Sequence, residues 1–414
     1  MDMHGVSRPR AGTTIALALA FSVFSPAIGW AQLACNSVVL VEPEGLKFGR
    51  NLDGPFEHGY WLVSPRGAAK SAYLSQGSAG EPVTWTARYG SLTINAYHVD
   101  MPLGGMNEAG LVVEHLAVPS KFPPPDGRPA ITPHQWIQYQ LDMCGSVEEV
   151  LARDTEVRLD GWVFECMHYI VGDASGALAV IEYLADKAGR SERRVYTLDE
   201  MPDYMTALSN APYRSHVRYM ERFTGFGGDE PIPTDRASFK RETRNRFAYS
   251  AQRLRDYEAG PDVDPVAYVF ATLDASNWGK GTPISLVYLP SSGAIHFKTC
   301  NNPTVRTLMM GDFDLAPGAP RQGLYWHKSV AGAAWETDIS GVNDYLVDAF
   351  RECKAFGAFR RFADEIRAYS AEREESARAP TPRRVGWLPW LGGGAALCVV
   401  WVACAWGHRR RRAA

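Results

Sequence analysis

The strands of this chain come in pairs separated by short turns, and this pairing restricts the folds it can adopt. Each member of a pair is a short run rich in β-branched and apolar side chains. The pairs occupy residues 35–41 with 46–51, 169–172 with 178–183, and 285–289 with 294–298. Helical segments lie between these groups. We therefore expect antiparallel sheets layered with helices, an α+β fold, rather than a parallel doubly wound sheet.

Helices are predicted from apolar periodicity and from residues that begin helices. Ser146 and Glu149 form a capping-box pattern at the start of one of them. The predicted helices occupy residues 132–143, 147–153, 213–223, 265–276 and 345–371. The chain contains no G-x-G-x-x-G sequence and no Walker loop, so nothing predicts a nucleotide site.

Composition excludes some classes of function. The chain has 414 residues, 46% of them hydrophobic, which is enough for a large core, and a net charge of −3, which argues against a general nucleic-acid binder. Of seven cysteines, Cys144, Cys166, Cys300 and Cys353 could form up to two disulfides or remain free. No C-x-x-C or H-E-x-x-H sequence occurs, and no metal or organic cofactor is expected.

The first 34 residues resemble a secretory signal with a possible short propeptide. Arg8 and Arg10 form a basic start, residues 14–24 an apolar run, and residues 27–34 an exit rich in small side chains. Cleavage and trimming there would leave Cys35 at the N-terminus. Such a cysteine combines a nucleophilic thiol with an α-amino group that can accept its proton.

The C-terminus predicts a membrane anchor. Residues 385–407 carry no charge and are long enough, at about 1.5 Å per residue, to cross a hydrocarbon core of about 30 Å. A basic tail follows at residues 408–414, and a linker at residues 376–384 precedes the segment. The basic tail is predicted to face the cytoplasm. A processed sorting signal is the alternative. The remaining residues 35–375 are predicted to be the folded domain.

The first hairpin predicts two partners for Cys35. If residues 35–41 pair with residues 46–51, Arg50 and Asp53 return beside the start of the mature chain. A cation near the sulfur favours the thiolate, and a carboxylate near the amine orients it. The simpler alternative is an ion pair at the end of a hairpin.

Several motifs, in order along the chain, resemble the choloylglycine hydrolase and penicillin V acylase family, and two of them its Gram-negative branch. The resemblance extends from Cys35 to about residue 300. The motifs are F-G-R-N-L-D at 48–53, W-L-V-S-P-R-G at 61–67, V-T-W-T-A-R-Y-G-S at 83–91, G-M-N-E-A-G-L at 105–111, L-S-N-A-P at 208–212 and N-R-F at 245–247.

The resemblance implies a four-layer αββα fold of the N-terminal-nucleophile class and hydrolysis of a small-molecule N-acyl amide. Cys35 matches the nucleophile whose amine is the base, Arg50 the arginine beside the sulfur, and Asp53 the carboxylate that holds the amine. Asn210 matches an asparagine that stabilises the oxyanion, and Arg246 an arginine that supports the pocket. Family substrates include penicillin V, N-acyl homoserine lactones and bile-acid conjugates.

The sequence departs from the family at Ala117, where many members have an asparagine or an aromatic residue that contributes to the oxyanion site. Losing such a donor costs about 10²–10³ in rate if nothing replaces it. His115 is interpreted as a packed strand residue. For Asn210 the alternative role is a turn residue before Pro212. For Arg246 the alternative is a solvated helix face within the basic run 240–255.

Cys166 and His168 lie two positions apart, on one face of a strand, and a buried structural pair is favoured there over a catalytic dyad. The predicted protein is thus an exported amidase on the periplasmic side of the inner membrane, tethered by one C-terminal helix. The alternative is a lipidated or catalytically weakened, membrane-anchored binding protein on the same fold. No nucleic-acid partner is expected, and a homo-oligomer is left open.

Overall fold

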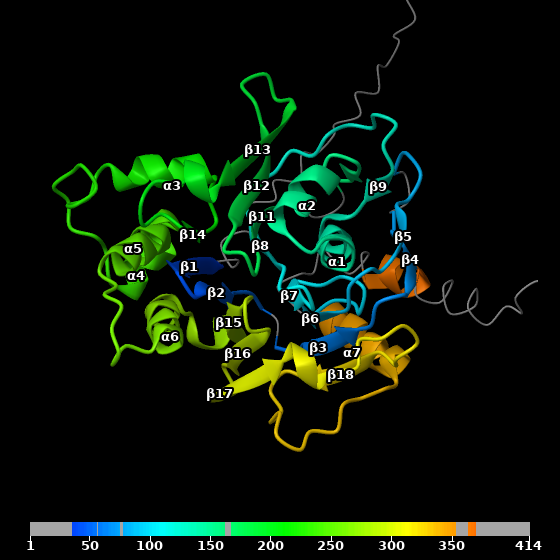
Figure 1. Ribbon diagram of the computed structural model, residues 1–414. Coiled ribbons are helices and arrows are strands. Elements are labelled where there is room, and N and C mark those ends of the chain that lie inside the picture. Colours follow the sequence, from blue (N-terminus) through cyan, green and yellow to red (C-terminus); the bar gives the residue numbers. More distant parts are fainter. Residues whose placement is uncertain (1–34, 56, 75–77, 162–166, 353–362, 370–414) are drawn as a thin grey trace, which may run out of the picture. The chain divides into compact units, whose positions relative to one another are not determined.

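Two antiparallel sheets dominate the computed structural model, which describes residues 35–55, 57–74, 78–161, 167–352 and 363–369 (Figure 1). Within these residues one sheet has six strands, in the order β14 (Ala207–Leu208), β1 (Asn36–Glu42), β2 (Gly45–Leu52), β15 (Ile284–Leu289), β16 (Ala294–Thr299) and β17 (Asn302–Met309). The other has eight, in the order β13 (Ser191–Thr197), β12 (Leu178–Ala185), β11 (Met167–Gly172), β8 (Val112–Ala117), β7 (Gly104–Asn107), β6 (Ser91–Asn95), β3 (Tyr60–Ser64) and β18 (Gln322–Tyr325).

Two short strand pairs and several helices accompany the two sheets, and the described residues 363–369 are also helical. β4 (Ala69–Ser71) pairs with β5 (Thr84–Thr86), and β9 (Ala130–Ile131) pairs with β10 (Arg158–Leu159). The α-helices are α1 (Pro133–Met143), α2 (Val147–Arg153), α3 (Tyr213–Met220), α4 (Arg236–Arg241), α5 (Arg244–Arg255), α6 (Pro265–Ser276) and α7 (Ile339–Glu352). Short 3-10 turns are η3 (Leu198–Glu200), η4 (Gly279–Gly281) and η5 (Met310–Asp312).

Strand β2 shows why the six-stranded sheet is covered on both faces. Successive side chains of a strand point to opposite faces. Phe48 faces the eight-stranded sheet, where a Cβ on Gly172 would contact its ring. Gly49 faces α6, and a Cβ there would overlap Val269. The helix therefore packs closely on this sheet because β2 presents a glycine to it.

Strand β8 divides its side chains between two neighbours in the same way. Glu114 points toward the six-stranded sheet, where it meets Arg50 of β2. His115 points toward α1, where its ring packs against that of His134. The two sheets thus face each other through a buried interior, and helices cover their outer sides (Figure 1). The predicted mixture of antiparallel sheets and helices is confirmed.

The structure reproduces several predicted boundaries and changes others. The helices predicted at residues 147–153 and 265–276 match α2 and α6, and the Ser146 side chain caps α2 by accepting from the Glu149 amide at 3.2 Å. α3 ends at Met220, before the predicted 223, and α7 begins at Ile339 rather than at residue 345. The basic run 240–255 contains the end of α4 and all of α5. Glu242 and Thr243 lie between the two helices.

The predicted signal peptide, linker, apolar segment and basic tail lie outside the described residues. In the part of the chain that the structure describes, no helix combines the length and apolar character needed to cross a bilayer. Cys144 and Cys300 have free thiols, and Cys166 and Cys353 lie outside the described ranges.

Candidate active site

Cys35 lies directly before β1 and is almost fully buried, with 3% of its surface exposed. The β1–β2 hairpin pairs Asn36 with Asn51 and Ser37 with Arg50, so the end of β2 returns beside Cys35. The Sγ–H group of Cys35 donates to the backbone oxygen of Asp53 at 3.6 Å. The hairpin register, which apolar alternation and a short turn specify, therefore brings Cys35, Arg50 and Asp53 together.

Arg50 is fully buried between the two sheets. Its Nε donates to Glu114 Oε2 at 3.1 Å, and its Nη2 donates to the backbone oxygen of His115 at 2.6 Å. Burial lowers the pKa of Arg50, but the negative charges of Cys35 and Glu114 outweigh it, and the pKa is raised overall. A permanent cation thus lies beside the Cys35 sulfur.

Asp53 is buried at the end of β2 with one oxygen satisfied. Its Oδ1 accepts from the hydroxyl of Thr282 at 2.5 Å, whereas Oδ2 has no hydrogen-bond partner among the described residues. Burial raises the pKa of Asp53 to about 7, although Thr282, Arg246 and Arg50 act against the rise. A buried carboxylate oxygen without a partner is costly, so this atom is suited to accept from an N–H donor.

Asn210 and Arg246 form a second group, built by the segment after β14 and by α5. Arg246 is buried, and its Nη2 donates to Asn210 Oδ1 at 3.0 Å and to Thr243 Oγ1 at 2.7 Å. Burial lowers the pKa of Arg246, against the charges of Asp53 and Cys35, which raise it. Arg246 is therefore not on a solvated helix face, and it lies within electrostatic reach of Cys35.

The same contacts orient the amide of Asn210. With Oδ1 held by Arg246, Nδ2 donates to the backbone oxygen of Ala117 at 2.8 Å. A primary amide has two N–H donors, so Nδ2 retains one for a further acceptor. Ala117 contributes its carbonyl to this arrangement, and its methyl side chain adds no donor.

Glu114 and Tyr288 belong to this site but were not identified from the sequence. Tyr288 donates to Glu114 Oε1 at 2.6 Å, so both carboxylate oxygens of Glu114 have partners. Burial raises the pKa of Glu114 to about 7, against the lowering effects of Arg50 and Tyr288. A glutamate in the apolar run of residues 111–118 was the available signal, because buried carboxylates need partners.

The other sequence candidates occupy structural positions. The His115 Nδ1–H donates to the Leu103 carbonyl oxygen at 2.7 Å, and the ring packs on α1 against His134. His168 Nδ1 lies 2.9 Å from Glu182 Oε1 in a fully buried pair, while Cys166 lies outside the described residues. Among the described residues, no group of three or more His, Cys, Asp or Glu side chains is placed to hold a metal ion.

Known proteins resemble this chain in sequence and in fold. Residues 35–239 match the family described as linear amide C-N hydrolases, choloylglycine hydrolase family. The fold is similar to that of penicillin V acylase from Agrobacterium tumefaciens, with 22% identity, a TM-score of 0.57, and coverage of 70% of this chain and 90% of that one. It is also similar to a mutant conjugated bile acid hydrolase from Clostridium perfringens, with 19% identity, a TM-score of 0.55, and coverage of 71% and 98%. No curated protein matches the chain.

The family match defines a hydrolase that acts on linear amide C–N bonds. The chain belongs to the choloylglycine hydrolase family.

Proposed function

We propose that this protein is an N-terminal-nucleophile amidase with a four-layer αββα fold, and that it cleaves small N-acyl amides through Cys35. The supporting observation is the environment of that residue. Its sulfur lies beside the buried Arg50 and contacts Asp53, whose Oδ2 has no hydrogen-bond partner among the described residues. Removal of residues 1–34 would create an α-amino group at Cys35, and such a group would supply the donor that Oδ2 lacks.

The proposed reaction has two stages. The Cys35 thiolate attacks the amide carbonyl, and the resulting oxyanion accepts the second N–H of Asn210 Nδ2. The α-ammonium group then protonates the leaving nitrogen, the C–N bond breaks, and an amine departs from a thioester. Water, deprotonated by the α-amine, hydrolyses the thioester and releases a carboxylic acid and the free thiol.

Each supporting side chain has one task in this scheme. Arg50 stabilises the thiolate, Asp53 orients the amine, and Arg246 holds the amide of Asn210. Since the Ala117 side chain offers no donor, the Asn210 amide is the side-chain oxyanion donor in this proposal. No step requires a metal or an organic cofactor.

The proposed substrates are penicillin V, N-acyl homoserine lactones or other aliphatic N-acyl amides, and conjugated bile acids. The Gram-negative sequence resemblance favours acylated signalling molecules or aliphatic amides over bile conjugates. A hydrolysis panel that varies acyl length and leaving amine separately tests this order. Faster cleavage of bile conjugates than of every aliphatic N-acyl amide would reverse it.

Replacing Cys35 tests the nucleophile. Cys35→Ser removes the thiolate while nearly preserving side-chain volume, so we expect turnover of penicillin V to fall at least about a hundredfold with the fold intact. Cys300→Ser is the matched control, because Cys300 is a half-buried free thiol outside the site. Turnover by Cys35→Ser equal to that of the control would reject the assignment.

N-terminal sequencing and intact mass test the maturation that the scheme requires. We expect a purified chain that begins with an unmodified Cys35 and reacts with one equivalent of iodoacetamide at that residue. Retention of residues 32–34, or the mass of a lipid on the cysteine, would contradict the mechanism.

We also propose the periplasmic side of the inner membrane as the location, with residues 385–407 as the anchor. Protease accessibility in spheroplasts would check this location.

A further inference from the structure

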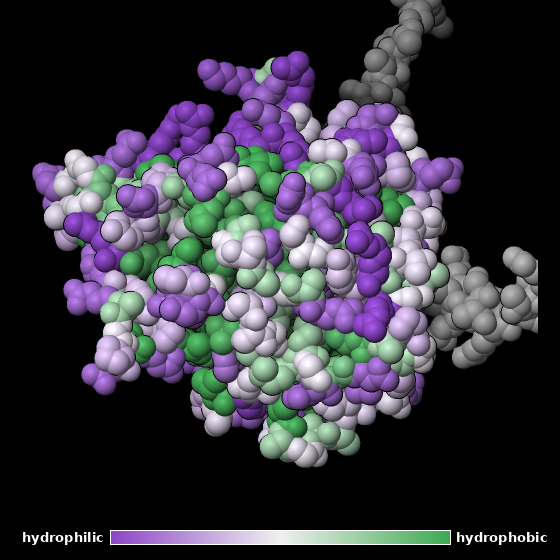
Figure 2. All heavy atoms as spheres, viewed as in Figure 1, coloured by the Kyte–Doolittle hydropathy of each residue, from purple (hydrophilic) through white to green (hydrophobic). Residues whose placement is uncertain are grey.

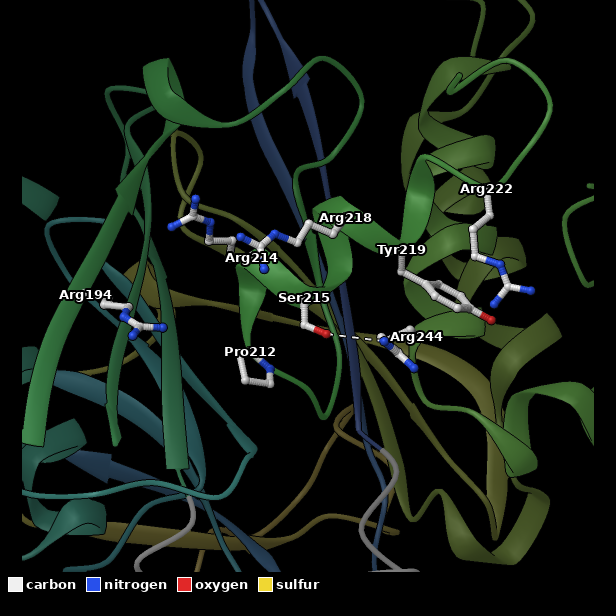
Figure 3. Close-up of a pocket in the computed structure, with 8 residues that line it drawn as sticks. All are labelled: Arg194, Pro212, Arg214, Ser215, Arg218, Tyr219, Arg222 and Arg244. Carbon is white, nitrogen blue, oxygen red and sulfur yellow. Dashed lines mark hydrogen bonds between the residues drawn. The ribbon is translucent and has the colours of Figure 1, made fainter. Parts of the chain in front are cut away.

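Five arginines surround one surface cavity of about 490 Å³ (Figure 3). They come from three segments that are distant in sequence: β13, α3 with the residues after it, and the start of α5. Hydrophilic residues dominate the surface over α3 and the β12–β13 hairpin (Figure 2). The arginines are Arg194, Arg214, Arg218, Arg222 and Arg244, and Tyr219 lies among them.

Three of these arginines have glutamate partners. The pairs are Arg194 with Glu192 at 2.5 Å, Arg222 with Glu230 at 2.7 Å, and Arg244 with Glu242 at 2.7 Å. Arg214 and Arg218 have no acidic partner among the described residues, and both are exposed. The cavity therefore has two positive charges that the described protein does not neutralise.

The placement of these two charges is unfavourable without a counterion. Arg214 and Arg218 are four residues apart on α3, so they lie on the same helix face, and like charges at this spacing destabilise a helix. Figure 3 shows both side chains extending from α3 toward Arg194 on β13.

We infer that this cavity binds a phosphate monoester or a diphosphate. A phosphate monoester carries a charge of about −1.5 to −2 at pH 7, which matches the two charges without partners. Guanidinium groups also donate in pairs to phosphate oxygens. The Tyr219 ring and the Ser215 hydroxyl, which accepts from Arg244 Nη1 at 3.4 Å, add polar and aromatic surface beside the cations.

This site is separate from the candidate active site. Cys35, Arg50, Asp53, Asn210 and Arg246 are not among the residues that line it. It is nevertheless close in sequence, because Pro212 and Arg244 of the cavity lie two positions from Asn210 and Arg246. Its ligand is therefore bound as an additional group and is not the amide that is cleaved.

Isothermal titration of the full chain with sodium pyrophosphate tests the inference. We compare the unmodified protein with Arg214→Gln/Arg218→Gln and with the charge-matched control Arg88→Gln/Arg190→Gln. Arg88 and Arg190 lie on the surface in ion pairs with Glu149 and Asp186, and neither lines the cavity. We expect saturable binding that is weakened at least tenfold in the first variant and unchanged in the control.

Either of two results would overturn the inference: no saturable binding of pyrophosphate at millimolar concentration, or equal weakening in both double variants. Circular dichroism and penicillin V hydrolysis check that the variants are folded. If Cys35→Ser is folded and inactive but still binds pyrophosphate, the cavity is independent of the proposed amidase site.

A second arm identifies the source of the phosphate group. Glycerol 3-phosphate represents a free ester, and detergent micelles containing phosphatidic acid represent a lipid headgroup, with phosphatidylcholine micelles as the control. Competition with pyrophosphate by glycerol 3-phosphate alone assigns a soluble ligand. Competition by phosphatidic acid micelles, and not by phosphatidylcholine, assigns a lipid. Competition by neither would count against a phosphate monoester as the ligand.

Discussion

At the residue scale, the chemistry of this site depends on charged groups whose burial costs desolvation free energy. Arg50, Asp53, Glu114 and Arg246 are all nearly or fully inaccessible to water. Arg50 has acceptors for all three guanidinium nitrogens, in Glu114, His115 and Asn51. Its position is therefore determined by several contacts at once, and the cation beside Cys35 cannot move away without leaving buried acceptors unsatisfied.

Asn210→Ala tests the proposed oxyanion donor. Because Asn210 is partly exposed and its remaining N–H is used only by the oxyanion in the proposed scheme, we expect kcat to fall by about 10²–10³ with little change in KM. Steady-state kinetics on penicillin V measure both constants. Asn301→Ala, at an exposed site, is the control and should leave both constants unchanged. A kcat within twofold of the unmodified protein would remove Asn210 from the mechanism.

At the scale of elements, the pairing of β7 with β8 determines where Glu114 can lie. Gly104 is opposite Glu114 in this pairing, and a Cβ on Gly104 would overlap the Glu114 carboxylate. Position 104 must therefore be a glycine, because any side chain there would overlap Glu114. Through Glu114 it affects Arg50, on the facing sheet, and hence the surroundings of Cys35.

Gly104→Ala should displace the Glu114 carboxylate from Arg50. We expect the free energy of unfolding to fall by about 1–3 kcal/mol, as for other overpacked interiors. We also expect kcat/KM to fall because Arg50 loses a partner. Urea unfolding followed by tryptophan fluorescence, with kinetics, measures both effects. Gly311→Ala is the control, because a Cβ there meets nothing within 4 Å. Equal behaviour of the two variants would refute the role of Gly104.

At the scale of the whole molecule, the described residues share one extensive core that joins the inner faces of both sheets. It includes Phe48 and Leu286 of the six-stranded sheet and Val112 and Ile170 of the eight-stranded sheet. Glu114 lies fully buried within the same interior. Its protonation state therefore contributes to the stability of the folded unit and not only to the site.

This coupling predicts a pH dependence of stability. The pKa of Glu114 is raised to about 7 in the folded chain, chiefly by burial, above the ordinary glutamate value of about 4.3 in the unfolded chain. Between these values the folded state binds more protons, so the free energy of unfolding falls as pH rises, by up to about 1.4 kcal/mol per pH unit for this group. Below about pH 4 and above pH 7 its contribution no longer changes.

Urea unfolding at pH 5, 6, 7 and 8 measures this dependence in Glu114→Gln and in the unmodified protein. We expect the variant to have a shallower decline between pH 5 and 7, because glutamine does not titrate. Glu148→Gln, at an exposed position of α2, should retain the original slope. Parallel curves for Glu114→Gln and the unmodified chain would show that Glu114 does not titrate in this range.

The amino-acid sequence by itself determined the features that depend on neighbouring residues. The β1–β2 hairpin that returns Arg50 and Asp53 to Cys35, the capped helix α2 and the helix α6 follow from local periodicity and turn residues. The order and spacing of the short motifs were also enough to indicate the family. Prediction was weakest for β13, β17 and β18, and for the separation of α4 from α5, where local patterns are ambiguous.

Only the tertiary structure decided which charged residues are buried and which remain on the surface. Arg246 and the cavity arginines belong to similar basic stretches of sequence, yet Arg246 is buried beside Asn210 while Arg214 and Arg218 stay exposed. The Arg50–Glu114 contact joins residues 64 positions apart. Such contacts depend on how two sheets and their helices pack, and no local pattern of residues contains that information.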